Sequence, residues 1–521
     1  MSWAPGAARG RVATIGGGVR LLLDIAELES GAELRAQVCI VGGGAAGITL
    51  ARRLAAKRLD VVLLESGGEG FEDEIQALYE GEAEGAPYLP LDSVRLRYLG
   101  GTTNHWEGQS VPLDRLDFER RGWVPGSGWP IAYQEYRRYV AEAQAVCEVS
   151  RGPFDYARAF PTGDVPASPE LPGFEPVLLR YSEPPTPFGV RYRQDLADDV
   201  NIRCCLHATC LGLGPDDSGS RVAFAEAGSL DGRRLRIVAD RYVLAAGAIE
   251  NSRLLHLSRR TSGVSLGNDF DQVGRYFMEH PALDLGDIVL GRDARTAYLR
   301  EARFRVAGTR FRRDIRLAPE VQAEGQILNH SVFLTENQIK PVTPANLGEQ
   351  IVRLWDKIGA RMFGEFGEQG DNFVWRIRLE HAPHAASRVT LADTTDPFGL
   401  GRAKVDFHFG ELERRTIWRV RERLASALGQ AGRGRMKVDP EEWLDRYVER
   451  LAWQNHHLGG TRMHDDPRHG VADANCRVHG TSNLYVAGAS VFPTSGHANP
   501  TMNLVALTLR LADHLTEATR D

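Results

Sequence analysis

The feature that most constrains this fold is a glycine-rich turn at residues 42–47, which reads GGGAAG. The turn directly follows an apolar run at residues 38–41 and opens a stretch with apolar residues at helical spacing, residues 48–57. A second apolar run at residues 61–64 ends in Glu65. This order predicts a strand, a helix and a second strand, the unit from which a parallel Rossmann-like sheet is built.

The three glycines of this G-x-G-x-x-G pattern serve different purposes. Gly42 permits the tight turn, Gly44 lets the backbone approach a pyrophosphate, and Gly47 lets the helix pack closely on the strand. The helix N-terminus offers unpaired N–H groups and partial positive charge to the phosphates. Glu65 follows Gly42 by 23 residues, close to the spacing of about 20 at which an acidic residue binds a ribose hydroxyl. We therefore expect a dinucleotide site rather than a glycine turn without a ligand.

Two later segments, residues 242–247 and 484–488, repeat the pattern of a buried strand that meets a glycine, here Gly247 and Gly488. Three such junctions predict one nucleotide-binding domain assembled from separated segments, with a second domain between them. Segments about 200 and about 440 residues beyond the first turn suit a large cofactor that the domain wraps. Because no second complete G-x-G-x-x-G is present for a nicotinamide nucleotide, FAD is favoured over NAD.

The second domain is expected to combine strands with at least one helix. Residues 373–379 alternate with the period of a half-buried strand. Residues 387–391 and 403–407 flank an Asp-Pro-Phe-Gly turn and predict a strand–turn–strand unit. Apolar residues spaced along 412–428 mark one face of a helix that stops at Gly429.

The predicted fold class is α/β: a Rossmann-like FAD-binding domain with a parallel sheet, plus an α+β substrate domain with an antiparallel sheet. Residues 300–370 show no clear period, and we expect loops and short elements there. The predicted boundaries are a loose N-terminal tail at residues 1–20, FAD-binding segments at 21–150, 201–264 and 446–521, and substrate-domain segments at 151–200 and 265–445.

Composition and charge exclude several classes of protein. Hydrophobic residues make up 42% of the chain and the net charge is −6, so no broad positive field recruits nucleic acid or anionic lipid. Six cysteines without a CxxC pair indicate a reducing compartment, and the apolar run at residues 21–23 is too short for a membrane span. We expect a cytoplasmic protein. The C-terminal histidines match no zinc-ligand spacing, so no metal site is predicted.

Four ordered motifs resemble those of the glucose–methanol–choline (GMC) flavin oxidoreductases. They are the dinucleotide turn, residues 100–106 (GGTTNHW), residues 247–252 (GAIENS) and the block 456–509. Within this family the chain resembles the bacterial branch of pyranose oxidases and sugar dehydrogenases. The resemblance implies FAD-dependent oxidation of an alcohol carbon on a sugar, glycoside or amino sugar, with oxygen or another molecule as electron acceptor.

The resemblance also implies which residues contact the cofactor. The segment 100–106 is expected to pack on the flavin, where His105 is either joined covalently to the ring or only contacts it. The full set implied to contact FAD is Gly42, Gly44, Gly47, Glu65, Gly101, Thr102, Asn104, His105, Gly247, Gly488, Asn499, Pro500 and Thr501.

Catalysis is assigned by the same resemblance to His457 and Asn499. His457 begins a His-x-x-Gly-Thr segment, and a neutral imidazole with a pKa of about 6.5 can accept the hydroxyl proton while hydride leaves the carbon. The Asn499 amide can hold the substrate oxygen. The tandem with His456 leaves open which ring faces the substrate, and the motif register favours His457. His497 either lines the pocket or caps a turn.

Two other kinds of function stay open at this stage. A flavin-binding electron-transfer or scaffold protein is one, although it has no need of the pair His457 and Asn499. Oxidation of a carbon–carbon bond, or of an alcohol that is not a carbohydrate, is the other. The exact substrate, the choice between oxidase and dehydrogenase, and the oligomeric state are equally open.

Overall fold

The structure is a computed structural model, and it describes residues 14–15, 18–19, 21–161, 170–263, 265–290, 304–336, 373–436, 444 and 451–517. Within these residues the chain forms two large sheets and two small ones. Residues 14–15 and 18–19 pair as two short antiparallel strands, β1 and β2. The rest of the predicted N-terminal tail lies outside the described residues.

The first large sheet has eight strands in the order β10-β11-β12-β4-β5-β9-β3, with β22 beside β12. Its centre, from β12 through β3, is parallel, and β22 is parallel to β12. This parallel core confirms the predicted Rossmann-like class. The bounds are β3 Leu22–Asp24, β4 Ala32–Val41, β5 Val61–Leu64, β9 Ile202–Leu206, β10 Thr209–Pro215, β11 Val222–Gly228, β12 Arg234–Leu244 and β22 Leu484–Val486.

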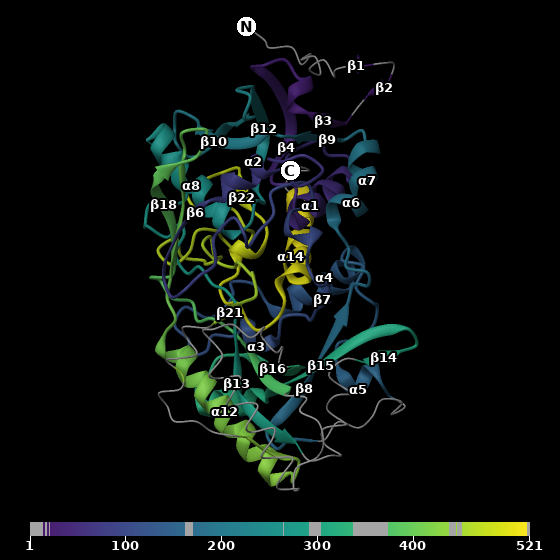
Figure 1. Ribbon diagram of the computed structural model, residues 1–521. Helices are drawn as coiled ribbons and strands as arrows, with labels where there is room; N and C mark the ends of the chain where they lie inside the picture. The colour runs from purple at the N-terminus through teal and green to yellow at the C-terminus, as the bar shows by residue number, and fades with distance from the viewer. Residues whose placement is uncertain are drawn as a thin grey trace, which may run out of the picture.

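The strand–helix–strand unit at the first glycine turn is confirmed, with shifted ends. β4 begins at Ala32, six residues before its apolar run, because residues 32–37 are at least partly exposed and include the polar side chains of Glu33, Arg35 and Gln37. Helix α1 (Ala45–Ala55) begins inside the glycine turn and ends two residues before Lys57. Helix α1 packs on β4, β5 and β9, α14 (Pro500–Glu517) packs on α1, and α4 (Tyr133–Val146) packs on the other side of α14 (Figure 1).

The second large sheet has nine strands in the order β20-β13-β17-β16-β15-β8-β7, with β14 beside β15 and β21 beside β13. All its pairings are antiparallel, as predicted for the substrate domain. The bounds are β7 Gln109–Ser110, β8 Phe174–Tyr181, β13 Pro281–Leu290, β14 Phe304–Val306, β15 Thr309–Leu317, β16 His330–Glu336, β17 Phe373–Leu379, β20 Gly434–Met436 and β21 Ala452–Trp453.

The expectation of loops and short elements across residues 300–370 misses two longer strands in the part that the structure describes. Strands β15 and β16 are central members of the nine-stranded sheet, and helix α10 (Pro319–Gly325) joins them. The alternation was hidden because charged side chains such as Arg312 and Asp314 are themselves buried in β15. Apolar periodicity is lost where both faces of a strand are buried and one of them is polar.

The three-stranded sheet and the remaining helices complete the described fold. Strands β18 (Arg388–Thr395) and β19 (Gly401–Phe407) form the predicted strand–turn–strand unit, and β6 (Gly81–Gly85) adds a parallel strand to it. The other elements are η1 Ile25–Glu27, α2 Asp73–Gln76, η2 Ala77–Tyr79, η3 Gly101–Asn104, α3 Arg115–Phe118, α5 Tyr156–Ala159, α6 Phe188–Arg191, α7 Arg193–Asp198, α8 Ala248–Ser262 and η4 Ala489–Val491.

The two faces of the nine-stranded sheet differ in chemistry. Helix α12 (Glu411–Gln430) covers one face, where Leu283, Val332 and Ile377 share an apolar core with Val420 (Figure 1). The helix was predicted to stop at Gly429, one residue before its observed end. Because successive side chains of a strand point to opposite faces, the residues next to these apolar ones face away from α12.

That second face carries a set of charged and polar side chains that we call the polar wall. Ser331 lies directly opposite Arg378 in neighbouring strands, and Asp314 approaches Arg378 from the next strand. The polar wall consists of Arg312, Asp314, Arg316, Ser331 and Arg378.

Among the described residues, no helix combines the length and the hydropathy needed to cross a bilayer.

Candidate active site

The glycine turn is shaped by packing at two positions and left open at the third. A Cβ atom added to Gly42 would lie 2.7 Å from the Ala245 carbonyl oxygen, and one on Gly47 would lie 1.8 Å from the Gly42 carbonyl oxygen. A Cβ atom on Gly44, which caps the N-terminus of α1, meets no protein atom within 4 Å. The backbone at Gly44 is thus open to a ligand at the helix N-terminus, as a pyrophosphate requires.

Glu65 lies at the end of β5, beside this turn. Its carboxylate accepts hydrogen bonds from the backbone N–H groups of Gly43 (2.8 Å) and Gly67 (2.9 Å). Burial of the carboxylate raises its pKa above the ordinary value, although these two N–H groups act in the opposite direction. A carboxylate has about four acceptor sites, so this geometry leaves capacity for a ribose hydroxyl.

The other two predicted glycine junctions meet the first one. A Cβ atom on Gly488 would lie 3.9 Å from the Ala46 side chain, while one on Gly247 would meet nothing within 4 Å. Both glycines have positive φ angles, +104° and +86°, which L-residues rarely adopt. The carboxyl ends of β4, β12 and β22 therefore frame an open edge of the parallel sheet, and this edge fits the adenosine pyrophosphate part of FAD.

The segment that was expected to pack on the flavin lies against the same turn. The Gly100 N–H donates to the Gly43 carbonyl oxygen at 2.8 Å, and a Cβ on Gly101 would lie 3.4 Å from Gly44 Cα. Within helix η3, Thr102 Oγ1 accepts from the Leu96 N–H at 3.4 Å.

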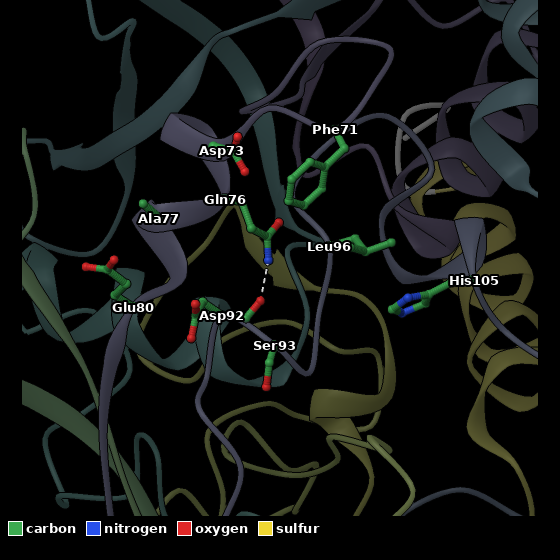
Figure 2. Close-up of a pocket in the computed structure, with 9 residues that line it drawn as sticks. All are labelled: Phe71, Asp73, Gln76, Ala77, Glu80, Asp92, Ser93, Leu96 and His105. Carbon is green, nitrogen blue, oxygen red and sulfur yellow. Dashed lines mark hydrogen bonds between the residues drawn. The ribbon is translucent and has the colours of Figure 1, made fainter.

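Two further side chains of this segment have separate surroundings. The Asn104 side-chain N–H group donates to the Leu99 carbonyl oxygen at 3.0 Å. His105 is exposed and lines an open pocket of about 410 Å³, where it lies beside Leu96 (Figure 2). Desolvation lowers the pKa of His105, so the ring is a neutral nucleophile near neutral pH.

The tandem histidines occupy an extended segment and point to opposite sides. Leu458 pairs with Met278 through two backbone hydrogen bonds of 2.8 and 3.0 Å. On one side His456 meets His280, and on the other side His457 lies beside Glu279. Only one of the two rings can therefore face any given site.

His457 lies in an aromatic environment. Its ring centre is 5.9 Å from that of Phe277 and 6.4 Å from that of Tyr88. Its Nε2 is 3.8 Å from a Glu279 carboxylate oxygen and has no hydrogen-bond partner in the part of the chain that the structure describes. Burial, with a smaller effect from the charge of Arg95, lowers the pKa of His457 to about 3.

His456 belongs to a hydrogen-bonded chain of buried groups. Its Nδ1 lies 2.8 Å from Nδ1 of His280, and Nε2 of His280 lies 2.9 Å from the Gly496 carbonyl oxygen. Burial lowers the pKa of His280 to about 3 and that of His456 well below its ordinary value, and the charge of Arg378 lowers both further. Both rings are therefore neutral near neutral pH.

Asn499 is held by the polar wall. Nη1 of Arg378 donates to Asn499 Oδ1 at 2.8 Å, and Nη2 donates to Ser331 Oγ at 3.2 Å. The Asn499 carbonyl accepts from the Asn503 side chain, and Pro500 opens helix α14 directly afterwards. Thr501 follows in the first turn of the helix.

The structure therefore groups Asn499 with His456 rather than with His457. Arg378 touches Asn499 and acts electrostatically on His456, whereas the cation that acts on His457 is Arg95. The predicted pair of His457 and Asn499 stays a prediction, and the contacts of Arg378 and His280 offer His456 as an alternative partner for Asn499. Motif register alone could not resolve this, because adjacent residues of an extended segment face opposite sides.

Several polar residues beside Asn499 were not singled out by the sequence. Arg378 lies in β17, Ser331 in β16 and His280 directly before β13, and no short motif contains them. His497, for which two roles were open, is fully buried, and its Nε2 lies 3.1 Å from Asp114 Oδ2. Its position beside the polar wall agrees with a lining role rather than a turn cap.

Comparison with known proteins decides the family. A family model described as "GMC oxidoreductase" matches residues 383–508, and one described as "NAD(P)-binding Rossmann-like domain" matches residues 40–69. The chain belongs to the GMC oxidoreductases. It is thus an FAD-dependent oxidoreductase that acts on CH–OH donors.

Curated GMC relatives match over almost the whole length. The chain is 23% identical to the fructose dehydrogenase large subunit of Gluconobacter japonicus, over 92% of this chain and 97% of that protein. It is 24% identical to paromamine 6'-oxidase of Streptomyces fradiae, over 91% of this chain and 90% of that protein. Among solved structures, pyridoxine 4-oxidase from Mesorbium loti has the same fold, with a TM-score of 0.57, 18% identity, and coverage of 92% of this chain and 99% of that one.

Proposed function

We propose that this GMC oxidoreductase oxidises a carbinol group of a sugar, a glycoside or an amino sugar. The observation that carries the proposal is the polar wall next to Asn499. A largely buried surface with three guanidinium groups, a carboxylate and a hydroxyl group suits a substrate with many hydroxyl groups and disfavours a simple aliphatic alcohol. Two relatives named for fructose and paromamine support the same substrate class.

The side chains that we assign to the chemistry are a histidine and Asn499. FAD, when bound, supplies the flavin N5 that accepts the hydride. The histidine accepts the hydroxyl proton of the alcohol, because hydride leaves the carbon more easily when that proton departs. Asn499 holds the alcohol oxygen and fixes its direction.

Of the tandem histidines, we assign the base role to His456. The motif register of the sequence assigns this role to His457, and that assignment stays a prediction. Flavin reduction by His456→Ala and by His457→Ala distinguishes the two assignments. His456 shares its side of the segment with Asn499 and Arg378, while His457 packs between Phe277 and Glu279. A base must lie within hydrogen-bond reach of the proton that it accepts. Because Asn499 holds the alcohol oxygen, the base must lie on the same side of the segment as Asn499.

Arg378 determines which end of the Asn499 amide faces the alcohol. Its Nη1–H donates to Oδ1 of Asn499, so the amide oxygen is occupied and the NH₂ group remains as a donor. A donor directed at the alcohol oxygen stabilises the negative charge that develops there as the proton leaves. The hydroxyl proton is then directed away from Asn499, toward the base.

We also propose that the domain boundaries predicted from the sequence separate the two functions. The eight-stranded sheet then belongs to the FAD-binding domain, and the nine-stranded sheet with its polar wall belongs to the substrate domain. Three strands depart from a simple division, since β6 pairs with β19 of the second part, and β7 and β21 join the nine-stranded sheet.

The test is anaerobic reduction of the bound flavin. The holoenzyme is mixed with neutral sugars, glycosides, amino sugars and simple alcohols, and loss of the visible flavin absorbance is followed. The proposal expects bleaching by at least one carbohydrate and none by its analogue deoxygenated at the oxidised carbon. Bleaching by aliphatic alcohols alone would overturn the carbohydrate assignment. A flavin that no alcohol reduces would favour an electron-transfer protein.

A further inference from the structure

We infer that His280 is a positioning residue that holds His456 in a single tautomer, with the proton on Nδ1 and the lone pair on Nε2. This inference rests on the proposed function, since it explains how His456 is prepared to accept a proton at Nε2. His280 does not touch the reacting groups in this account. It acts through His456 alone.

The hydrogen bond from His280 to Gly496 determines the tautomer of His280. Nε2 of His280 lies 2.9 Å from the Gly496 carbonyl oxygen and 3.3 Å from that of Ser495. A carbonyl oxygen can only accept, so Nε2 of His280 carries the proton. A neutral imidazole has one N–H group, and Nδ1 of His280 is therefore an acceptor.

The contact between the two rings then determines the tautomer of His456. Nδ1 of His280 and Nδ1 of His456 are 2.8 Å apart, which is a hydrogen-bond distance. Since His280 accepts in this contact, His456 must donate through Nδ1–H. Its other nitrogen, Nε2, then has a lone pair, and it makes no hydrogen bond within the described part of the chain. The second nitrogen of a histidine commonly sets the tautomer of the first in this way.

The surroundings keep the rings of His280 and His456 neutral. His280 is fully buried, and the charge of Arg378 further opposes a positive charge on either ring. Two other titratable groups face this segment. One is His457, the next residue in the chain. The other is Glu279, one of whose carboxylate oxygens accepts hydrogen bonds from the backbone N–H groups of His280 (2.8 Å) and His456 (2.7 Å). The other oxygen of Glu279 is turned toward Tyr88 and His457.

The variants that test this role are His280→Gln and His280→Leu. A glutamine amide can donate to Gly496 and accept from His456, and the carbonyl of Gly496 forces that orientation. His280→Gln should therefore preserve the tautomer of His456, whereas an apolar leucine removes its acceptor. The matched control is His330, which is also fully buried beside the nine-stranded sheet but hydrogen-bonds Leu328 and Leu317.

The kinetic readout is the rate of flavin reduction by the best alcohol under anaerobic conditions. Loss of the correct tautomer in a catalytic triad lowers turnover by up to about 10⁴-fold, and we expect His280→Leu to lose at least about tenfold. His280→Gln should recover most of that loss, and His330→Leu should reduce flavin within about threefold of the wild type. FAD content and thermal midpoint, measured for every variant, identify losses that come from misfolding.

A second readout does not depend on any substrate. The holoenzyme is labelled with ¹⁵N-histidine, and long-range ¹H–¹⁵N spectra report the tautomer of each ring, with His456 assigned from its loss in His456→Ala. We expect the Nδ1–H tautomer for His456 in the wild type and in His280→Gln. An Nε2–H tautomer in the wild type overturns the inference, and so does normal reduction by His280→Leu when His456→Ala is inactive. Failure of every alcohol to reduce the wild type counts against the proposed function, and the spectra alone then decide the tautomer.

Discussion

His280 and His456 meet through their Nδ1 atoms at 2.8 Å, on the side of the segment that also carries Arg378 and Asn499. The contact orients His456, the residue that we assign as base. Because His280 is anchored to the Gly496 carbonyl, four residues before Pro500, the contact also ties this base to the loop that presents Asn499. The two assigned catalytic groups are thus attached to one loop, His456 through His280 and the Gly496 carbonyl, and Asn499 as part of the loop itself.

Gly44→Val should abolish FAD binding while the protein still folds. A Cβ atom at this position meets no protein atom within 4 Å, and φ at Gly44 is −84°, so we expect the substitution to clash with the pyrophosphate rather than with the protein. The measurement is the FAD-to-protein ratio together with the thermal midpoint. Gly122→Val is the control, since a Cβ atom there also meets nothing within 4 Å. Full FAD occupancy in Gly44→Val would place the pyrophosphate elsewhere.

FAD should be released when the holoenzyme is precipitated with acid. His105 is exposed at the edge of its pocket, and we expect it to contact the flavin without a covalent bond. Absorbance of the supernatant and of the pellet decides between the alternatives. A yellow pellet that becomes colourless in His105→Ala would instead establish a covalent link through this ring.

The rate of flavin reduction should be independent of pH between about 5 and 8. The sequence alone suggested a rise through an imidazole pKa of about 6.5. Burial lowers the pKa of both His456 and His457, so a base at either position is already neutral throughout this range. The rate should fall only in more acidic solution, where the ring gains a proton. A rise centred near pH 6.5 in stopped-flow reduction would contradict the buried environment of the base.

Arg378 and Asn499 should act as a unit. Hydrogen bonds from charged groups contribute about 1.5–3 kcal/mol, so Arg378→Met should slow flavin reduction by about 10–100-fold. Asn499→Ala should lose less than removal of the base, because the proton acceptor stays in place. In the double variant the two losses should not add, since the residues are in direct contact at 2.8 Å. Strict additivity of the activation free energies would show that Arg378 does not act through Asn499.

The sequence predicted the nucleotide-binding half of this molecule well because the signals there are local. The strand before Gly42, the helix after it and the strand that ends in Glu65 are adjacent in the chain, and their apolar periods are uninterrupted. Strand β15 could not be found in the same way. Its charged side chains are paired inside the fold, Arg312 with Asp314 of the same strand and Arg316 with Asp114 and Glu175 from elsewhere in the chain.

The catalytic pair shows a second limit of sequence reasoning. Both tandem histidines lie in the motif, and a strand-like segment turns neighbouring side chains to opposite faces. Which face holds the site depends on Arg378 and His280, which approach from elsewhere in the chain. The motif therefore leaves two neighbouring candidates for the base, and our proposal of His456 rests on these tertiary contacts.

The central claim is that alcohol oxidation depends on His456, and single-turnover flavin reduction tests it most directly. The holoenzyme, His456→Ala and His457→Ala are mixed anaerobically with the alcohol that best bleaches the wild-type flavin. We predict that His456→Ala retains FAD but is slower by about 10²–10⁴-fold, the usual loss when a general base is removed. His457→Ala should retain most of the rate. Normal reduction by His456→Ala together with an inactive His457→Ala would contradict the account.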